Sequence, residues 1–530
     1  MFGPRHHRAL FFGIFGLLTI LGAAPFWLTR ILPMQDYPHF LLFARIFGDC
    51  RVEGSPFHGT YTTGFPLAPL LLPILVTRAL ASFSSFETAG RVIWTLYAVG
   101  LPVASVHLLG VLRRDPWCAL LVFPLVISYW VIGGFFAFAT GMPLLLIGLA
   151  ASVRWLEAPT LRRGLVLAAL VVAAFLWHAL IFAQLALDFG VLWLLHRAES
   201  GRARAWAIAP LGPAMAIFSA WMAASVSGHG PGQKPPLWAP VLDNATHFFT
   251  FLGPLPEAAG AAFLLALVLV AGAAAVSAPT PGASVAFRVK APFTWLAIGS
   301  AVGYAILPRV CFGVEGINNR QPYLAALLFV FGWTLPARRA PRALLLGAVG
   351  MASALGLVHL GRRFAAFERE TAGASRLLDR VEPGEALLAP LDRVSTSSFP
   401  GKPLVALDLY SAIRHGGLPS SSFAGYEINL IRYVNNQNPM PTLTTSGWQA
   451  NPGITKFGYV LLRGPVGSSI GREGFLRLVA KDGDFTLFSV CGGGRQPACP
   501  TPPAAPATPP APTVTPAAKS PAAAPSFARP

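Results

Sequence analysis

Apolar runs long enough to cross a bilayer alternate with short polar segments along the first two thirds of the chain. The first run, residues 9–28, has about 20 positions, which is the length that a transmembrane helix needs. Similar runs continue to residue 360 and together predict about 11 transmembrane helices. They are expected at residues 9–28, 91–112, 116–131, 137–153, 205–224, 258–276, 293–307, 322–335 and 344–360, with a helical pair at 164–195 that is broken near Trp177 and His178.

Residues 65–83 form a further apolar run, but three prolines interrupt it. The first external loop and the Arg113–Arg114 pair are expected on opposite sides of the membrane, so the chain should cross only once between them. Residues 91–112 fit that crossing better than residues 65–83 do. We therefore expect 65–83 to be a re-entrant or non-spanning helix on the outer side, with Arg78 reaching the interface. An ordinary span that violates the charge rule is the alternative.

The charges sit between the apolar runs and not along them. Only 12% of the 530 residues are charged, far below the roughly 25% of soluble domains. The formal net charge is +18, and short arginine clusters carry most of it. Such clusters are typical of cytoplasmic loops that fix the topology of a membrane protein, so we expect no nucleic acid partner. The same rule places the amino terminus in the cytoplasm and the carboxy-terminal part outside.

Three regions follow from this composition. Residues 1–360 are expected to form a transmembrane domain, with external loops at 29–90 and 225–257. Residues 361–491 predict a small external α/β domain, because helical and strand patterns alternate there. Residues 492–530 are rich in proline and alanine, which predicts a disordered tail.

The external domain should contain two helices and a small sheet. Helices are expected at 364–381 and 405–414, and strands at 385–390, 457–463, 476–481 and 485–490, the last two joined as a hairpin by Asp482-Gly483-Asp484. None of the five cysteines has the spacing of a metal site. Cys491 and Cys499 flank a glycine-rich turn, and both a disulfide bond and a pair of free thiols are compatible with this pattern.

An acid follows the first predicted span, in the stretch Leu32-Pro33-Met34-Gln35-Asp36-Tyr37-Pro38-His39. Ionisable groups beside a membrane are costly, which makes Asp36 and His39 functional candidates. Dehydration raises the pKa of a carboxyl group and so makes Asp36 a better general base near neutral pH. An Asp before Pro38 is also an ordinary helix-capping signal, and both interpretations remain open. Apolar spacing over 37–48 predicts a helix along the membrane surface.

The other polar candidates are all expected on the same external side. Arg320 offers a planar fork of donors for a phosphate, or it anchors the end of a span. His39 could orient the Asp36 carboxylate, contact phosphate or simply lie at the interface. The remaining candidates for substrate or phosphate binding are His58, His178, Lys234 and Arg309, each of which could instead be an ordinary interfacial or solvent-facing side chain.

This layout resembles the GT-C glycosyltransferases, integral membrane enzymes that take sugars from polyprenyl-phosphate carriers, as protein O-mannosyltransferases and aminoarabinose transferases do. The local matches are Gln35-Asp36-Tyr37-Pro38-His39 for the acid of the first loop and Asn319-Arg320-Gln321-Pro322-Tyr323 for the arginine that opens a late span. The segment from Phe123-Pro124 to Gly133-Gly134-Phe135 resembles one that is common in bacterial members. Many members carry a second acid in the next external loop, but residues 128–138 contain no Asp or Glu. This departure argues against a metal-dependent mechanism.

The resemblance implies an all-α polytopic protein of a bacterial-type inner membrane. It would transfer a hexosyl or pentosyl group from a polyprenyl-phosphate donor to an extracytoplasmic acceptor, with Asp36 as general base and Arg320 on the carrier phosphate. The alternative is a non-catalytic transporter or scaffold for lipid-linked saccharides. Transporters usually place polar residues at mid-membrane on repeated halves. No repeat is visible here, and the spans are almost free of ionisable groups, which favours the enzyme.

Overall fold

In the computed structural model, the described residues cover most of the chain with several gaps. They are 4–196, 205–227, 237–238, 283–311, 314–332, 335–336, 338–391, 394–399, 401–425, 429–435, 437–441, 443, 448–465, 475–494 and 496. Lys234, most of the loop expected at 225–257, the span expected at 258–276 and nearly all of the tail expected at 492–530 lie outside them.

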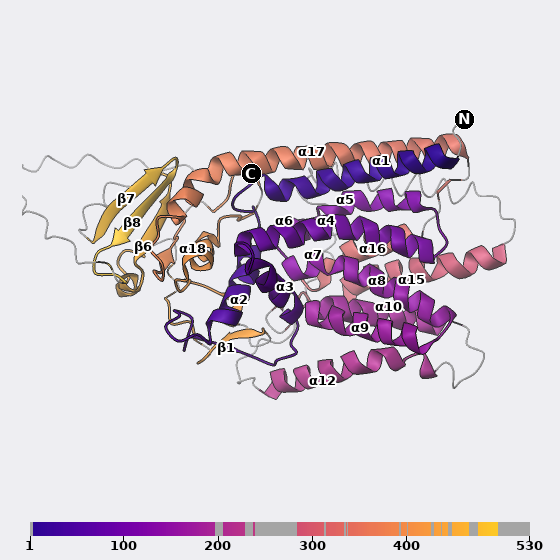
Figure 1. The fold of residues 1–530 in the computed structure, drawn as a ribbon, viewed down its shortest axis with the longest axis horizontal. Coiled ribbons are helices and arrows are strands. Elements are labelled where there is room, and N and C mark those ends of the chain that lie inside the picture. The colour runs from indigo at the N-terminus through magenta and orange to yellow at the C-terminus, as the bar shows by residue number, and fades with distance from the viewer. Residues whose placement is uncertain are drawn as a thin grey trace, which may run out of the picture.

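A bundle of helices that share one long axis makes up most of the molecule (Figure 1). Four helical segments in the described part are long and apolar enough to cross a membrane: Arg8–Trp27, Phe86–Val111, Phe136–Glu157 and Arg339–Leu378. The predicted number of 11 spans is not confirmed. The helices that precede the long last one are α1 (Pro4–Ala23), α2 (Tyr37–Asp49), α3 (Leu71–Ala81), α4 (Phe86–Val111), α5 (Phe123–Val126), α6 (Tyr129–Ile132), α7 (Phe136–Thr140), α8 (Met142–Glu157), α9 (Leu161–Trp177), α10 (Ala179–Leu195), α12 (Gly212–Ser227), α15 (Ala283–Ile306) and α16 (Gln321–Gly332).

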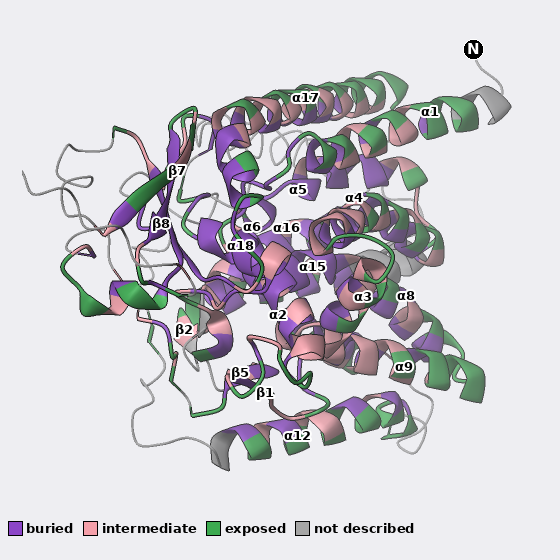
Figure 2. Cartoon of the chain, turned by 60° about the vertical axis from the view of Figure 1, so that its left-hand side comes forward, coloured by how far each residue is buried: buried purple, intermediate pink, exposed green. Residues whose placement is uncertain are grey.

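The outward faces of the bundle are apolar. Figure 2 shows buried residues in the middle of the molecule and exposed ones along the outer faces of α1, α9, α12 and α17. Among these exposed side chains are Phe12, Ile20 and Leu165, each more than half accessible. Water would disfavour such a surface, whereas a hydrocarbon environment suits it. The bundle therefore has the surface of a membrane-spanning domain.

The observed helices test three predicted features of the bundle. The pair at 164–195 is confirmed, since α9 ends at Trp177 and α10 begins at Ala179, with His178 in extended conformation between them. In the region 65–83 the helix α3 has only 11 residues, well short of the roughly 20 that a spanning helix needs. The expected span at 116–131 is wrong as one continuous helix, because the chain leaves helical geometry at Ile127, between α5 and α6.

The last helix is much longer than predicted. A span at 344–360 and a separate helix at 364–381 were expected, but α17 runs without interruption over Arg339–Leu378, 40 residues. At 1.5 Å per residue its length is about 60 Å. Its sequence has no proline after Pro341, and Gly361 alone does not end it. The helix therefore links the membrane bundle rigidly to the carboxy-terminal part (Figure 1).

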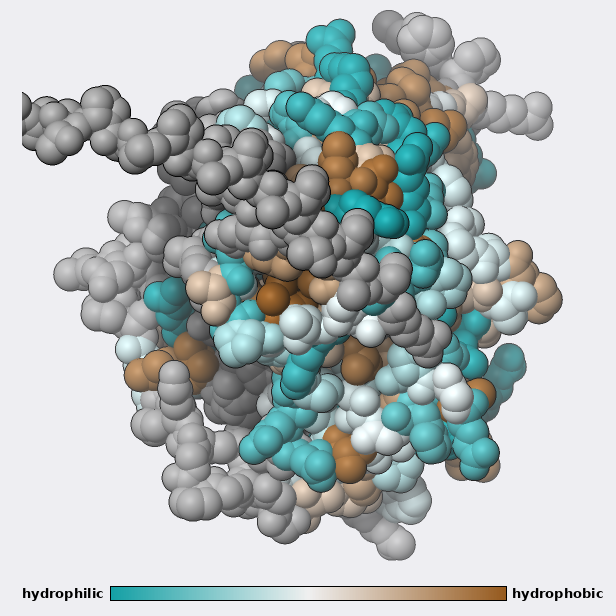
Figure 3. All heavy atoms as spheres, turned by 90° about the vertical axis from the view of Figure 1, so that its left-hand side faces the viewer, coloured by the Kyte–Doolittle hydropathy of each residue, from teal (hydrophilic) through white to brown (hydrophobic). Residues whose placement is uncertain are grey.

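The carboxy-terminal part carries the predicted small sheet. Its order is β4-β6-β8-β7, with β4 parallel to β6 and the other neighbours antiparallel. The expected hairpin is confirmed, with Asp482 paired to Phe485 around the turn and Gly483 at a positive φ of 56°. The expected helix at 405–414 is α18. The bounds are β4 (Leu387–Leu388), β6 (Tyr459–Arg463), β7 (Leu476–Asp482), β8 (Phe485–Val490) and α18 (Leu407–His415). Figure 3, which looks onto this end, shows hydrophilic residues mixed with smaller apolar patches.

The first external loop packs directly onto the carboxy-terminal part. Strand β1 (Tyr61–Thr63) pairs antiparallel with β5 (Ile431–Tyr433), and the Tyr61 ring stacks on Tyr433 at 5.0 Å. Arg414 forms an ion pair of 2.7 Å with Glu87, and both side chains are largely buried. Helix α2 lies beneath α18, and eight of its 13 residues are buried. The expected helix at 37–48 therefore exists, but protein rather than lipid covers its apolar face.

Cys491 is disulfide-bonded, which excludes the free-thiol alternative for this residue. Cys499 lies outside the described residues. Cys50 and Cys118 are buried free thiols.

Candidate active site

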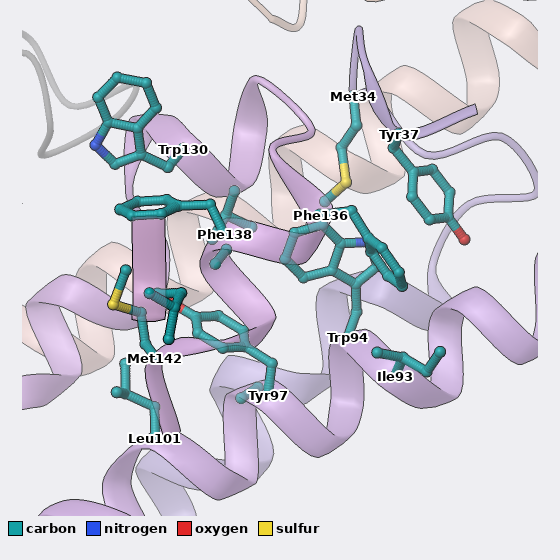
Figure 4. Close-up of a cluster of buried hydrophobic side chains, with 14 of the residues drawn as sticks. Met34, Tyr37, Ile93, Trp94, Tyr97, Leu101, Trp130, Phe136, Phe138 and Met142 are labelled. Atoms are coloured by element: carbon teal, nitrogen blue, oxygen red, sulfur yellow. The ribbon is translucent and has the colours of Figure 1, made fainter. Parts of the chain in front are cut away.

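The short helices α6 and α7, with the turn between them, form a platform of residues 129–140. Figure 4 shows their aromatic side chains packed against helix α4 and against the loop that carries Met34 and Tyr37. Phe136 lies 5.6 Å from the Tyr37 ring and 5.4 Å from the Trp94 ring, centre to centre. Packing against the core thus fixes the position of the platform, which can in turn position the side chains that contact it.

The loop of Asp36 is fixed to this platform through its backbone. The Asp36 amide donates a hydrogen bond of 3.1 Å to the Gly133 carbonyl oxygen. Gly134 has a φ of +81°, and a Cβ at this position would lie 2.5 Å from the Tyr37 nitrogen. Only glycine therefore allows this close approach. The two adjacent glycines place the acid with respect to the aromatic rings that follow.

The Asp36 carboxylate does not cap a helix. Asp36 occupies the N-cap position of α2, yet its side chain accepts no hydrogen bond from the first turn. Burial raises its pKa from 3.8 to about 6, and the nearby Arg320 guanidinium only partly opposes this rise. The pKa of Tyr129 is also raised, first by burial and then by the charge of Asp36, so its hydroxyl lies in the same environment. The carboxylate is thus available to a ligand.

Arg320 lies at the end of the short 3₁₀ helix η5 (Asn318–Arg320) that opens α16. Its guanidinium carbon lies 4.9 Å from the centre of the Phe135 ring, 5.1 Å from Phe138 and 5.8 Å from Trp130. The side chain is 4% exposed, and its Nε is buried without a hydrogen-bond partner in the described structure. Burial lowers its pKa to about 10, and the charge of Asp36 opposes this. Three aromatic rings and the distant charge of Asp36 stabilise this buried cation without using its N–H donors, which leaves donors for a ligand.

His178 belongs to the same neighbourhood. Its ring lies 5.8 Å from Phe138, one of the rings on Arg320. Its Nδ1 accepts a hydrogen bond of 3.1 Å from the Leu180 amide, which leaves the proton of the neutral ring on Nε2. Burial, with a smaller contribution from Arg320, lowers its pKa well below the usual value. His178 is therefore a neutral group with one donor.

His39 faces the carboxy-terminal part instead. Its ring stacks on Phe423 of the 3₁₀ helix η6 (Phe423–Gly425), with centres 3.7 Å apart and planes 11° from parallel. Burial lowers its pKa to about 3, so the ring is neutral. Its Nδ1 is buried without a partner, and no hydrogen bond joins it to the Asp36 side chain in the described structure. The geometry thus does not show His39 orienting the carboxylate.

The structure does not bring His58 or Arg309 to this platform. The His58 ring is exposed and contacts the Cys50 carbonyl oxygen at 3.2 Å. The Arg309 side chain is exposed, while its backbone closes the hairpin of β2 (Val310–Cys311) and β3 (Val314–Glu315). Lys234 lies outside the described residues.

Sequence reasoning missed the aromatic platform itself. Tyr129, Trp130, Phe135 and Phe138 look like ordinary core residues of a span, and the only signal was the Gly133-Gly134 pair, which does not belong in a continuous transmembrane helix. Within the described residues no three His, Cys, Asp or Glu side chains come together as metal ligands.

Comparison with known proteins identifies the fold. No protein-family model and no curated protein sequence matches the chain. Among the solved structures that match are the crystal structure of ArnT from Cupriavidus metallidurans bound to undecaprenyl phosphate, with a TM-score of 0.54, and the same protein in the apo state, with a TM-score of 0.53. Each is 14% identical to this chain; the alignments cover 92% and 93% of this chain and 98% and 99% of ArnT. The chain therefore has the fold of ArnT over nearly its whole length.

Proposed function

We propose that this chain is a membrane glycosyltransferase that moves a sugar from a polyprenyl-phosphate carrier to an acceptor outside the cytoplasm. The observation that carries the proposal is the buried Arg320 guanidinium, whose Nε lacks a hydrogen-bond partner in the described structure and whose charge interacts with the carboxylate of Asp36. Buried charged donors without partners are rare unless a ligand completes them. An anion that accepts from a planar fork, such as a phosphate, suits Arg320.

The reaction requires a base and a stabilised leaving group. Asp36, with a pKa of about 6, is ionised at neutral pH and is a stronger base than an ordinary aspartate. It takes the proton of the acceptor hydroxyl while that oxygen attacks the anomeric carbon of the sugar. The bond from this carbon to the phosphate oxygen breaks, and the polyprenyl phosphate leaves with the additional negative charge. Arg320 stabilises that charge in a site from which water is largely excluded.

Other groups support these two roles. His178, with a proton on Nε2, donates to a phosphate or sugar oxygen, and Tyr129 lies on the exposed side of Asp36, where an acceptor can approach. The ArnT structure binds undecaprenyl phosphate, which is the type of carrier proposed here. We place the site at the external face of the membrane, with the amino terminus in the cytoplasm, because the arginine clusters mark the cytoplasmic loops.

The test does not require the sugar to be known. Cells that lack the chain are compared with complemented cells by mass spectrometry of their glycans, glycolipids and glycoproteins. Wild-type protein should restore a sugar-bearing product that Asp36→Asn does not restore at equal abundance in the membrane. Glu53→Gln, an exposed acid of the same loop, is the matched control and should restore it fully. Restoration by Asp36→Asn would remove the catalytic role and favour a non-catalytic carrier or scaffold.

A further inference from the structure

A small cluster of polar side chains joins two helices of the bundle. Gln184 and Asp188 lie one turn apart on α10, and Ser300 lies on α15, which packs beside α10 (Figure 1). The three residues are only 3%, 1% and 2% exposed. The Gln184 Nε2 donates one hydrogen bond of 2.8 Å to the Asp188 Oδ1 and another of 3.2 Å to the Ser300 Oγ. The cluster therefore connects helices whose bonded residues are 116 positions apart in the chain.

Stability alone does not explain this cluster. An acid inside a membrane bundle is costly and is a functional candidate by default. The Asp188 Oδ2 is buried without a hydrogen-bond partner in the described structure, which adds a cost that an apolar side chain would avoid. Well-packed apolar residues in place of buried polar groups often leave a protein equally or more stable. Hydrogen bonds between helices instead favour one relative position of the two helices, because other registers leave the polar groups unpaired.

Helix α15 leads from the cluster to Arg320. The carbonyl oxygen of Tyr304 accepts a hydrogen bond of 3.5 Å from the amide nitrogen of Asn318, two residues before the arginine. A Cβ on Gly303 would lie 3.3 Å from the Oε1 of Gln321, the residue after the arginine. The same turn of α15 therefore supports the chain on both sides of Arg320.

Helix α10 leads from the same cluster to His178, which is its N-cap residue. The His178 ring lies 5.8 Å from the Phe138 ring, and the guanidinium carbon of Arg320 lies 5.1 Å from the centre of that ring. One aromatic ring thus contacts both polar groups. The relative position of α10 and α15 therefore sets how these two groups are arranged around Phe138.

We propose that this cluster is an interhelical clamp that holds Arg320 against the Phe138 ring in the position that binds the carrier phosphate. The inference rests on the proposed function, since it takes Arg320 to bind that phosphate. Gln184, Asp188 and Ser300 are positioning residues, because they act through the two helices and not on the substrate. Asp188 contributes an acceptor oxygen to the clamp and not a charge, so asparagine should be able to replace it.

Binding of undecaprenyl phosphate to the purified full-length protein tests the clamp. Ser300→Ala removes the hydrogen bond between the helices and should weaken binding about threefold to tenfold, because a smaller fraction of molecules then holds Arg320 in place. Asp188→Asn keeps the acceptor and should bind within about twofold of wild type. Ser152→Ala is the matched control, since the hydroxyl of this buried serine donates to Gly148 of its own helix, and it should leave binding unchanged.

A second background distinguishes positioning of Arg320 from a general loss of packing. In Arg320→Gln protein, Ser300→Ala should cause no further loss of affinity, because the guanidinium through which the clamp acts is already absent. Equal losses in the two backgrounds would overturn the clamp, and so would full affinity of Ser300→Ala. A loss in Asp188→Asn as large as that in Ser300→Ala would assign the role to the charge and would also overturn it.

These outcomes are separate from failure of the proposed function. If wild-type protein binds undecaprenyl phosphate and Arg320→Gln weakens this binding, the proposed function stands even where the clamp is overturned. Wild-type protein that does not bind this lipid would refute both.

Discussion

Replacing Asp36 by asparagine should stabilise the protein while it abolishes transfer. The pKa of Asp36 is raised from 3.8 to about 6, so the folded protein holds the proton more tightly than the unfolded chain does. Stability is therefore lost as the pH rises through this interval, and above pH 6 the ionised carboxylate costs about 3 kcal/mol, an upper value for a half-buried group at 1.36 kcal/mol per pH unit. The attraction of Arg320 is already included, because it is one of the causes of the final pKa. Asparagine has the same shape and avoids this cost.

The capping interpretation predicts no gain in stability at either pH, since asparagine caps a helix about as well as aspartate does. Thermal unfolding of wild type and Asp36→Asn in the same detergent, at pH 4 and pH 8, distinguishes the two. We expect nearly equal melting temperatures at pH 4 and a higher one for the variant at pH 8. Glu53→Gln on the exposed part of the loop should show no such pH-dependent gap. A melting temperature for Asp36→Asn at pH 8 that equals that of wild type, or lies below it, would refute a desolvated, uncapped carboxylate.

Three further predictions concern the groups around Asp36. Arg320→Gln should weaken binding of undecaprenyl phosphate about tenfold or more in a direct binding assay, since a hydrogen bond to a charged group contributes about 1.5–3 kcal/mol. Arg309→Gln, at an exposed position, should leave this binding unchanged. Equal effects of the two substitutions would contradict the phosphate role of Arg320. Gly134→Ala should lower the free energy of unfolding by about 1–3 kcal/mol more than Gly54→Ala does. Gly54 is the control because its φ of 82° is similar but no atom lies within 4 Å of an added Cβ. Equal losses would show that residue 134 is not in close contact with the loop of Asp36. Glu87→Gln should destabilise by about 1–2 kcal/mol in the same assay, because Arg414 loses its charged partner Glu87 but keeps its ion pair of 2.9 Å with Asp379; no change in stability would mean that the pair with Glu87 is dispensable.

Local patterns in the sequence were sufficient to predict several elements of the fold. The break at His178, the hairpin around Gly483 and the helix α18 follow from short-range signals: a half-helix length, a turn and an amphipathic spacing. The continuous α17 was missed because residues 361–363 are polar enough to suggest a boundary. Helix formation depends on backbone compatibility, however, and a change of environment from lipid to water does not interrupt it.

What the sequence could not predict is long-range packing. Strands β1 and β5 pair although Tyr61 and Tyr433 are 372 positions apart in the chain. Neither strand is long enough to be recognised from the sequence pattern. The same limit applies to the stack of His39 on Phe423. Sequence periodicity indicates which face of α2 is apolar but not which neighbour covers it, so a helix covered by α18 was expected to face lipid.

The platform explains how an acid and an arginine far apart in the chain reach one site. Gly133 accepts the Asp36 amide, and within the next five residues Phe135 and Phe138 contribute two of the three rings on Arg320. One rigid segment therefore sets the distance between the carboxylate and the guanidinium, and neither group needs a direct ion pair to the other. A direct ion pair would neutralise the carboxylate and occupy the guanidinium donors. In the proposed mechanism, separation by the platform leaves the carboxylate for an acceptor and the guanidinium for a phosphate.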